Sequence, residues 1–381
     1  MREAILKATD AHKEAILKTY EQLHALPEWG LEEYKTSAYI KEWLRDADIP
    51  TRELAATGLV AELVGDEPGP VVGLRVDIDA LPFKNEAGET YYVHACGHDA
   101  HTAMGLWVLK VLKELNLVKR GQVRVIFQPA EERLVGARNM IAAGAATGLD
   151  ELYGVHIRPI QEARLGQAAP ALWQGGSTVA ELTVTGRAAH GARPHLGVNA
   201  IDGATLAIMA INSIWANPTQ QWSAKVTKIT GGGVASNIIP DRAIFTVDMR
   251  AETDSVMDEI IGKVRVAGEG GALAVGGKAE MSILGAVPAA QYDQELIDNL
   301  AVAITEVLGP EGLIPPIKSP GSDDFHEFKK ADPRLKAAFL ALGADATPGL
   351  HDPQMRLATD SLLIGTRILV FALAQRVGLA G

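Results

Sequence analysis

The chain contains one cysteine, few aromatic residues and no long apolar run. Because Cys96 is alone among 381 residues, it cannot form an intramolecular disulfide, which agrees with a reducing compartment. No segment reaches the roughly 18 apolar residues that a membrane-spanning helix needs. The charged residues 1–18 also lack the apolar core of a secretory signal peptide. We therefore expect a cytoplasmic protein with no membrane segment.

Positive charge is also in short supply. The chain has 36 lysines and arginines against 47 aspartates and glutamates, which gives a formal net charge of −11 and a pI near 5.4. This acidic balance argues against nucleic acid or an anionic membrane as a partner. The hydrophobic share of 47% is typical of a globular protein, and 381 residues exceed one typical core, so we expect two domains.

Hydrophobic patterns in the first and last parts of the chain predict an α/β domain. Helical spacing over residues 1–48 predicts two helices, and further helices are expected at 98–117 and 360–377. Short apolar runs predict strands at 59–64, 71–78, 122–127 and 152–156. Asp77 and Asp79 come at the end of the second of these strands, where the ligands of open α/β sheets gather.

The middle of the chain changes to alternating strands and two helices. The expected order is strand, helix, strand, strand, helix, strand, which suits a four-stranded antiparallel sheet with two helices on one face. The predicted elements are strands at 178–185, 222–229, 243–249 and 281–284 and helices at 199–213 and 255–267. The fold prediction is therefore a mixed-sheet α/β domain, residues 1–172 and 288–381, interrupted by an inserted α+β domain, residues 173–287.

The one cysteine lies in a short segment that is rich in possible metal ligands. His94, Cys96, His98 and His101 fall within eight residues, together with Asp99. Thiolate, imidazole and carboxylate are the side chains that hold divalent first-row metals. A lone cysteine is often only a small buried hydrophobe. Ligand types that cluster in this way are uncommon in cores, so the pattern favours a metal site.

Three further signals of the same kind occur later in the chain. Glu131 and Glu132 follow the strand at 122–127, His156 ends the strand at 152–156, and His351 lies in a loop. Each alone is compatible with a solvated carboxylate or a histidine bonded to backbone. Together with the first cluster they suffice for two neighbouring metals. Adjacent carboxylates can take two different roles, because one can bind metal while its neighbour acts as a base and takes a proton from water.

Several sequence blocks resemble a known family in order along nearly the whole chain. The family is the aminoacylase/carboxypeptidase-like metallohydrolases with co-catalytic metals. More narrowly, the chain resembles the amidohydrolase branch, which includes hippurate hydrolases, N-acyl-amino-acid deacylases and plant auxin-conjugate hydrolases. The blocks that carry the resemblance are residues 74–82, 94–101, 128–132, 186–192, 235–240 and 321–325.

The resemblance implies a role for each matching residue. Glu131 would be the general base, and His190 would direct a donor at the developing oxyanion, either in its own chain or across a dimer interface. Asn237 and Arg250 would bind the carboxylate side of the substrate. Asp77 would orient a ligand histidine, although a solvated aspartate at a strand end is an equal alternative. The implied metal ligands are Cys96, His98, Glu132, His156 and His351, with the Cys96 thiolate able to touch both ions.

The resemblance also implies an activity. It is that of a metal-dependent amidohydrolase, which cleaves the amide bond of an N-acyl or conjugated amino acid into a carboxylic acid and a free amino acid. The cofactors would be two divalent metal ions, manganese or zinc, with cobalt or nickel accepted in vitro. A metal-bridging water would lose a proton to Glu131. The inserted domain would act as a lid and offer a surface for a homodimer.

Three alternatives remain open. A dipeptidase or carboxypeptidase of the same family would use the same metals on peptides. Cys96 as nucleophile with His98 as base is a different chemistry, but it leaves the glutamate pair and His351 without a role. A binding or scaffold protein would keep the fold without turnover.

The chain departs from the relatives' pattern directly after the glutamate pair. Relatives have glycines there, whereas this chain has Arg133, Leu134 and Val135, a bulky and basic segment. We expect this segment to reshape the substrate pocket without removing a metal ligand or the base. The acyl group and the amino acid are not determined by the sequence.

Overall fold

The computed structural model describes residues 1–378 and divides them into two compact units. The first unit contains residues 1–173, 291–318 and the chain from 323 onward, and the second contains 174–290 and 319–322. Within residues 1–378, no helix has both the length and the apolar character needed to cross a membrane.

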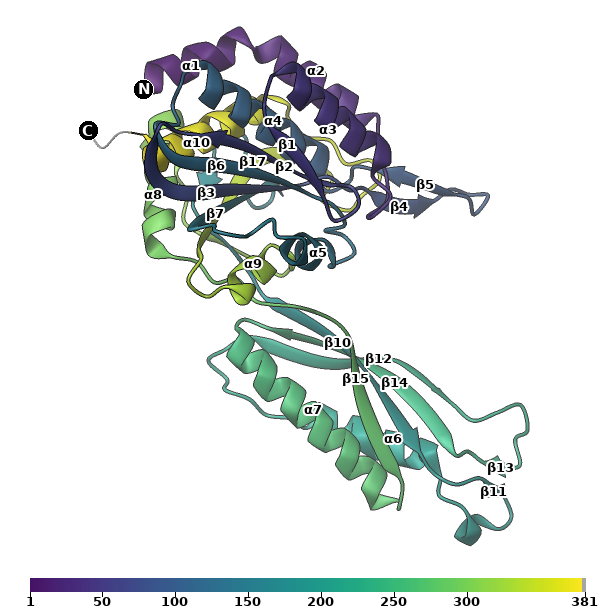
Figure 1. Cartoon of the computed structure of the whole chain (residues 1–381). Coiled ribbons are helices and arrows are strands. Elements are labelled where there is room, and N and C mark those ends of the chain that lie inside the picture. Colours follow the sequence, from purple (N-terminus) through teal and green to yellow (C-terminus); the bar gives the residue numbers. More distant parts are fainter. Residues whose placement is uncertain (379–381) are drawn as a thin grey trace. The chain divides into compact units, whose positions relative to one another are not determined.

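The first unit is built on a seven-stranded mixed sheet (Figure 1). The three central pairings, β6 with β3, β3 with β7 and β7 with β17, are parallel, and the outer pairings are antiparallel. The mixed α/β sheet predicted from the sequence is therefore confirmed. The strand order is β1 (Thr51–Leu54), β2 (Gly58–Val64), β6 (Arg120–Gln128), β3 (Glu67–Asp77), β7 (Glu151–Pro159), β17 (Lys336–Ala346) and β8 (Ala168–Ala169).

Helices cover both faces of this sheet, which is why its central strands are apolar on both sides. Figure 1 shows α1, α2, α4 and α10 over one face and the short α5 and α9 over the other. Separate apolar clusters fill the two interfaces. The helices are α1 (Arg2–Ala11), α2 (Lys13–His24), α3 (Tyr34–Asp46), α4 (His98–Glu114), α5 (Gly136–Ala142), α8 (Gln294–Leu308), α9 (His326–Ala331) and α10 (Asp360–Val377).

The prediction of two helices over residues 1–48 is wrong, because the structure has three. The chain leaves the helical conformation at His12, with φ −100° and ψ 7°, and this residue separates α1 from α2. Apolar residues keep helical spacing across the break, so the pattern could not reveal it. The third helix, α3, begins only at Tyr34, after the turn that follows Pro27.

The start of α4 fixes the position of the ligand-rich segment. Gly97 caps this helix with φ +89°, a left-handed conformation that side chains disfavour. A Cβ at Gly97 would also lie 2.4 Å from Cδ1 of Ile157. Glycine therefore lets the chain turn sharply between Cys96 and His98, and both side chains are buried.

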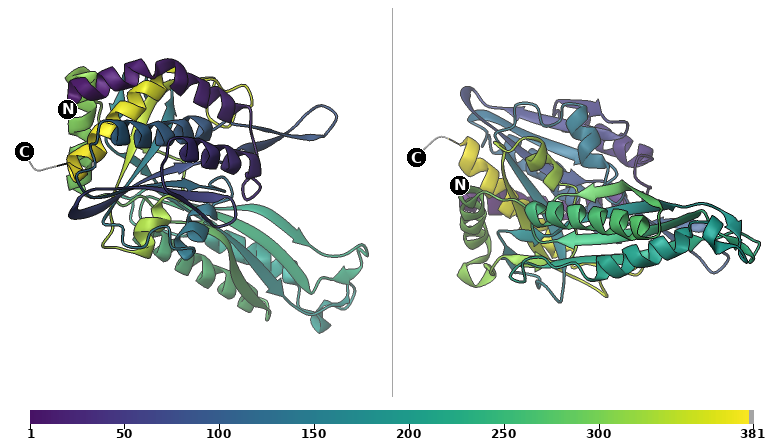
Figure 2. Two further views of the ribbon diagram at one scale, coloured as in Figure 1. Left: turned by 45° about the horizontal axis from the view of Figure 1, so that its top comes forward. Right: turned by 90° about the horizontal axis from the view of Figure 1, so that it is seen from below.

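The second unit is a four-stranded antiparallel sheet covered by two helices, in the order expected from the sequence. Leu182, Phe245 and Ile260 belong to its separate apolar core. Figure 2 shows the two helices side by side on one face of this sheet. The elements are β10 (Gly176–Thr185), α6 (Ala200–Asn212), β12 (Trp222–Gly231), β14 (Arg242–Ala251), α7 (Asp254–Ala274) and β15 (Lys278–Val287), with sheet order β12-β14-β10-β15.

The remaining elements are short. Two-stranded pairs are formed by β4 with β5, β9 with β16 and β11 with β13. The bounds are β4 (Leu81–Lys84), β5 (Thr90–Val93), β9 (Leu172–Gln174), β11 (Ala189–His190), β13 (Ile238–Ile239), β16 (Ile317–Ser319) and the 3-10 turns Pro194–Leu196 and Pro310–Gly312.

Candidate metal and catalytic centre

The ligand-type residues of the first unit converge at the carboxyl ends of the parallel strands. Asp79 follows β3, the glutamate pair follows β6, and His156 lies in the second half of β7. Cys96 and His98 flank the start of α4, beside the same sheet edge. His351 comes from the loop after β17, where its backbone N–H donates to the Ala95 carbonyl at 2.7 Å. The carboxyl edge of such a sheet is where ligands bind in open α/β folds.

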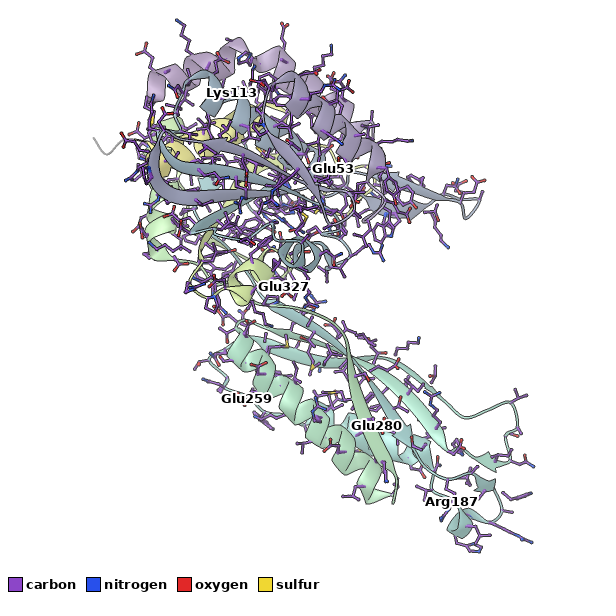
Figure 3. The ribbon with its side chains drawn as sticks, viewed as in Figure 1. Glu53, Lys113, Arg187, Glu259, Glu280 and Glu327 are labelled. Atoms are coloured by element: carbon purple, nitrogen blue, oxygen red, sulfur yellow. The ribbon has the colours of Figure 1, made fainter. Side chains whose placement is uncertain are left out.

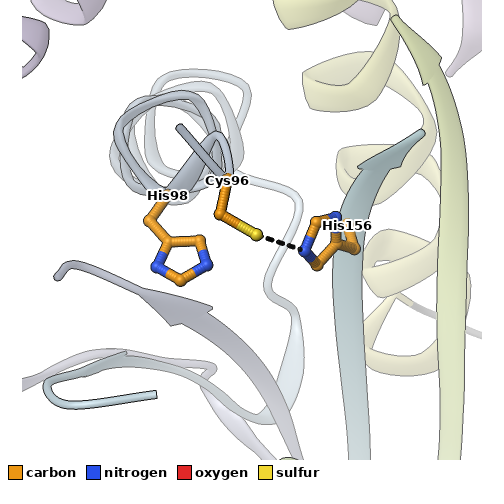
Figure 4. Close-up of side chains that lie close together, drawn as sticks. All are labelled: Cys96, His98 and His156. Atoms are coloured by element: carbon orange, nitrogen blue, oxygen red, sulfur yellow. Dashed lines mark hydrogen bonds between the residues drawn. The ribbon is translucent and has the colours of Figure 1, made fainter. Parts of the chain in front are cut away.

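Cys96 and His156 face each other inside the protein. The Cys96 Sγ lies 3.4 Å from Nε2 of His156 (Figure 4). The Nδ1 of His156 is 2.6 Å from the Ile157 carbonyl oxygen, a contact that requires Nδ1 to carry the hydrogen. Burial, with the charges of His101 and Arg158, holds the pKa of His156 well below its usual range. A neutral imidazole with its Nε2 lone pair toward a thiol is suited to metal ligation.

His98 is oriented by Asp79. Its Nδ1 lies 3.0 Å from the Asp79 Oδ1, which leaves Nε2 directed into the cluster. That Nε2 is buried and has no hydrogen-bond partner among residues 1–378. It lies 3.9 Å from a carboxylate oxygen of Glu131 and 3.9 Å from one of Glu132.

A second unpartnered atom belongs to Glu132. Its Oε1 is buried without a hydrogen bond within the described chain, and it lies 3.5 Å from Nε2 of His351. Buried polar atoms are normally satisfied, so two such atoms facing one another call for a further group. The ligand atoms fall into overlapping sets within 4.8 Å: Cys96, His98 and His156; Cys96, Glu132 and His351; His98, Glu131 and Glu132. This donor set fits divalent metal ions.

Burial raises the pKa values of Glu131, Glu132 and Cys96 in the cluster. It raises the pKa of Glu132 to about 7. Burial, with the charges of Asp323 and Glu132, holds the pKa of Glu131 well above its usual range. Burial and Glu132 also raise the pKa of the Cys96 thiol well above its ordinary value. A bound cation opposes all three shifts, because it favours the ionised forms.

A fully buried arginine, Arg75, forms ion pairs with carboxylates next to the cluster of candidate ligands. Arg75 on β3 has no exposed surface and pairs with Asp77 at 2.6 Å, Asp324 at 2.7 Å and Asp323 at 3.2 Å. Its Nε also donates to Oε1 of Gln128 at 2.9 Å. One cation thus balances three carboxylates, one at the end of β3 and two in the segment between β16 and α9.

The sequence predicted that Asp77 orients a ligand histidine, and in the structure Asp77 pairs with His101 and lies 3.9 Å from Nε2 of His98. Its Oδ1 pairs with Nδ1 of His101 at 2.6 Å, and its Oδ2 pairs with Arg75. Nε2 of His101 in turn accepts the Ile157 backbone N–H at 2.9 Å. Asp79 contacts the other ring nitrogen of His98, Nδ1, at 3.0 Å. Sequence reasoning noted Asp79 at the strand end without giving it a role.

Sequence reasoning also missed the residue that anchors the loop between β6 and α5, residues 129–135, which carries Glu131 and Glu132 and is called the glutamate loop below. Glu33 is fully buried, and its Oε1 accepts the Ala130 backbone N–H at 2.8 Å. Its Oε2 accepts the hydroxyl of Thr57 at 2.5 Å. Ala130 has φ +55°, a strained conformation that this anchor stabilises. Glu33 precedes a helix in the sequence and carries no signal of this contact.

The three candidates in the second unit lie in two places. His190 pairs with Ile238 across the β11–β13 ribbon, and Gly191 N–H donates to the Asn237 carbonyl at 2.7 Å. His190 and Asn237 are therefore neighbours. The Ala192 N–H donates to Nδ1 of His190 at 3.1 Å, so Nε2 is the nitrogen that carries a hydrogen.

Arg250 lies on β14, and its guanidinium pairs with Asp248 through two bonds of 2.9 Å. Near the β11–β13 ribbon, Arg187, labelled in Figure 3, donates from Nε to the Leu196 carbonyl at 2.9 Å.

Comparison with known proteins gives consistent matches. The family model for peptidase family M20/M25/M40 matches residues 73–375. The N-acetyl-L-cysteine deacetylase of Bacillus subtilis is 30% identical, over 93% of this chain and 86% of that protein. The IAA-amino acid hydrolase ILR1-like 2 of Arabidopsis thaliana is 30% identical, over 93% and 83%. The crystal structure of Bacillus subtilis YXEP, a dinuclear metal binding peptidase from the M20 family, has a TM-score of 0.83 at 25% identity, over 97% and 99%.

Replacing Arg75 by methionine tests the support network. Removing the cation leaves Asp77, Asp323 and Asp324 buried without compensation, so we expect a loss of about 3–5 kcal/mol in the free energy of unfolding. Arg75 lowers the pKa of Asp77 and of Asp324, so without it both carboxyls bind protons more tightly in the folded state. The variant's deficit should therefore be largest near about pH 8 and shrink toward about pH 5.5.

Urea unfolding of metal-stripped protein at the two pH values measures this effect. Arg334→Met is the matched control, because Arg334 is exposed and, within the described residues, its one ion pair is with the surface residue Asp332. A deficit that is equal at both pH values would contradict the charge-balancing role.

Proposed function

The chain belongs to the peptidase family M20/M25/M40, and from this premise we propose that it hydrolyses the amide bond joining an acyl group to an amino acid. It is a hydrolytic enzyme acting on amides, in keeping with relatives named as deacetylases and amino acid hydrolases. The observation that carries the proposal is the buried pair of unpartnered atoms, His98 Nε2 and Glu132 Oε1, beside Glu131.

The enzyme takes divalent metal ions, and we propose two of them, manganese or zinc, with cobalt or nickel accepted in vitro. Thiolate and imidazole favour zinc, and the carboxylate also suits manganese. When bound, the ions lower the pKa of water and polarise the amide carbonyl. The residues that would hold them are Cys96, His98, Glu132, His156 and His351.

Glu131 is proposed as the general base. It would take a proton from the attacking water and pass it to the leaving amine. A carboxyl whose pKa is raised by burial can carry a proton between these two steps near neutral pH. Asp79 would keep His98 in one orientation, since it holds the Nδ1 of that ring.

We assign the residues of the second unit to the substrate. His190 would donate from Nε2 to the developing oxyanion, because its Nδ1 already accepts a backbone N–H. Asn237 and Arg250 would bind the carboxylate of the amino acid. The second unit would thus act as a lid over the substrate.

We also propose that the enzyme forms a homodimer through the second unit. The strands β12 and β15 are the edges of its sheet, and edge strands can pair with another chain. Leu206 and Met209 lie on one side of α6, with exposed fractions of 40% and 62%. Apolar groups of this size favour burial against a second copy. The cytoplasmic location stays a prediction.

The first experiment is a substrate panel with the metal-loaded enzyme. We expect release of free amino acid from N-acetyl and N-benzoyl amino acids, loss of this activity in chelator and recovery when metal returns. Faster cleavage of dipeptides would favour the dipeptidase alternative. Activity that persists in chelator but disappears on thiol alkylation would favour Cys96 as nucleophile, although its raised thiol pKa argues against that chemistry. Binding without any turnover would contradict enzymatic function.

Glu131→Gln should lose turnover and keep metal. Removing the base should lower kcat on the order of 10²–10⁴-fold. Glu132→Gln is the matched variant, because it changes the neighbouring carboxylate and should lower the metal content as well. Turnover assays and metal analysis of both proteins separate the two roles. Near-normal turnover in Glu131→Gln would remove that residue from the mechanism.

Met209→Glu should shift the protein toward the monomer. A charge within the proposed apolar contact is costly to bury, so the dimer should dissociate. The sedimentation coefficient and the mass from light scattering should then fall toward the values of a single chain. Leu284→Glu, on the exposed strand β15, shows whether the contact involves that edge too. A wild-type protein that is monomeric at micromolar concentration would refute the dimer.

A further inference from the structure

One cation near the buried cluster has no acidic partner among residues 1–378. Arg133 follows Glu131 and Glu132 directly, and its side chain is exposed. No ion pair joins it to a carboxylate within residues 1–378, and its side-chain hydrogen bond runs from Nη1 to the Gly30 carbonyl oxygen at 3.0 Å. A guanidinium has five N–H donors, so most of its donors remain available.

The guanidinium is held in place by an aromatic ring. Its central carbon lies 5.8 Å from the centroid of the Trp29 ring. Gly30 leaves no room between the two segments, because a Cβ there would lie 2.8 Å from Cα of Ala130 and 2.9 Å from Cδ of Arg133. The cation–π contact with Trp29 and the hydrogen bond to Gly30 limit the motion of the side chain, while the other guanidinium donors stay free. Arg133 is therefore preorganised.

Arg133 and Trp29 both lie on segments that contact the candidate catalytic and metal-binding residues. Trp29 forms a bridge with Ala80, whose N–H donates to the Glu28 carbonyl at 2.8 Å. The preceding residue, Asp79, contacts His98 and also accepts the backbone N–H of Glu132 at 3.0 Å. Arg133 thus lies on the same loop as Glu131 and Glu132. It packs against Trp29, which forms a β-bridge with Ala80 just after β3.

A preorganised arginine with free donors is suited to bind a carboxylate through two parallel bonds. The α-carboxylate that every N-acyl amino acid carries is already assigned to Asn237 and Arg250. A further arginine adds discrimination only when the substrate carries another anionic group.

We propose that Arg133, seated on Trp29, is a specificity residue that binds a second carboxylate of the substrate. This inference rests on the proposed amidase function and narrows its substrate class to N-acyl amino acids with two carboxylates. The second carboxylate can come from a dicarboxylic acyl group or from an acidic amino acid side chain, and the experiment distinguishes these sources.

The test compares three substrates on the metal-loaded wild-type enzyme and on Arg133→Met. N-acetylalanine has one carboxylate, N-succinylalanine has the second on its acyl group, and N-acetylaspartate has it on its side chain. A lost charged hydrogen bond should lower the ratio of kcat/KM for the preferred diacid to that for N-acetylalanine by about 10-fold to 100-fold. The diacid whose ratio falls identifies the source.

Two further variants control for other effects. Arg133→Lys keeps the charge without the paired donors, and we expect it to recover only part of the ratio. Arg138→Met removes a nearby arginine that pairs with Glu327, and its ratio should equal that of the wild type. Thermal unfolding of each variant shows whether Arg133 serves only to pack Trp29 against the glutamate loop.

The outcomes separate the two proposals. Unchanged kcat/KM ratios in Arg133→Met would overturn the subsite and leave the amidase function standing. This holds whether kcat/KM falls equally for all three substrates or does not fall at all. A metal-loaded wild-type enzyme that cleaves none of the three and no other N-acyl amino acid would overturn the function itself, and the subsite with it.

Discussion

The pairing of Arg75 with three carboxylates is the interaction on which the first unit's chemistry depends. The cation lies on β3 with no exposed surface, and Asp324 reaches it from a segment 249 residues later in the chain. The other oxygen of Asp324 accepts the Ala137 N–H at the start of α5. One buried charge therefore ties β3, the region after the glutamate loop and the turn before α9 together. Together with His98 and His101, Arg75 also holds the pKa of Asp77 well below its usual range, which favours the ionised carboxylate that contacts His101.

Around that support, the cluster combines groups whose protonation preferences conflict. Burial favours neutral forms of Glu131, Glu132 and Cys96, whereas the proposed base Glu131 and the proposed metal ligands Glu132 and Cys96 act in their ionised forms. The rigid anchors are what hold such a set together: Asp79 fixes His98, the Ile157 carbonyl fixes His156, and Glu33 fixes the loop before Glu131. Fixed orientation keeps the lone pairs directed inward, so that metal binding needs little rearrangement.

The sequence predicted the mixed sheet, the order of the inserted elements and the clustering of the candidate ligands, because periodicity and ligand types are local signals. It could not predict that Asp77 pairs with His101 and Asp79 with His98. Both aspartates lie at the same strand end, and the sequence does not reveal toward which histidine each side chain points. Glu33 and Arg75 escaped notice because their partners lie far away along the chain. The break at His12 was missed because the apolar spacing continues through it. The roles of His190, Asn237 and Arg250 stay predictions.

The strand order has a consequence for synthesis on the ribosome. In the first unit β17 lies between β7 and β8, two strands that precede it by more than 160 residues. The sheet, and with it His351, is incomplete until residues 336–346 have emerged. The four strands of the second unit are contiguous in the chain and are available earlier. The inserted unit is thus positioned to fold first during translation, while the sheet of the first unit still lacks β17 between β7 and β8.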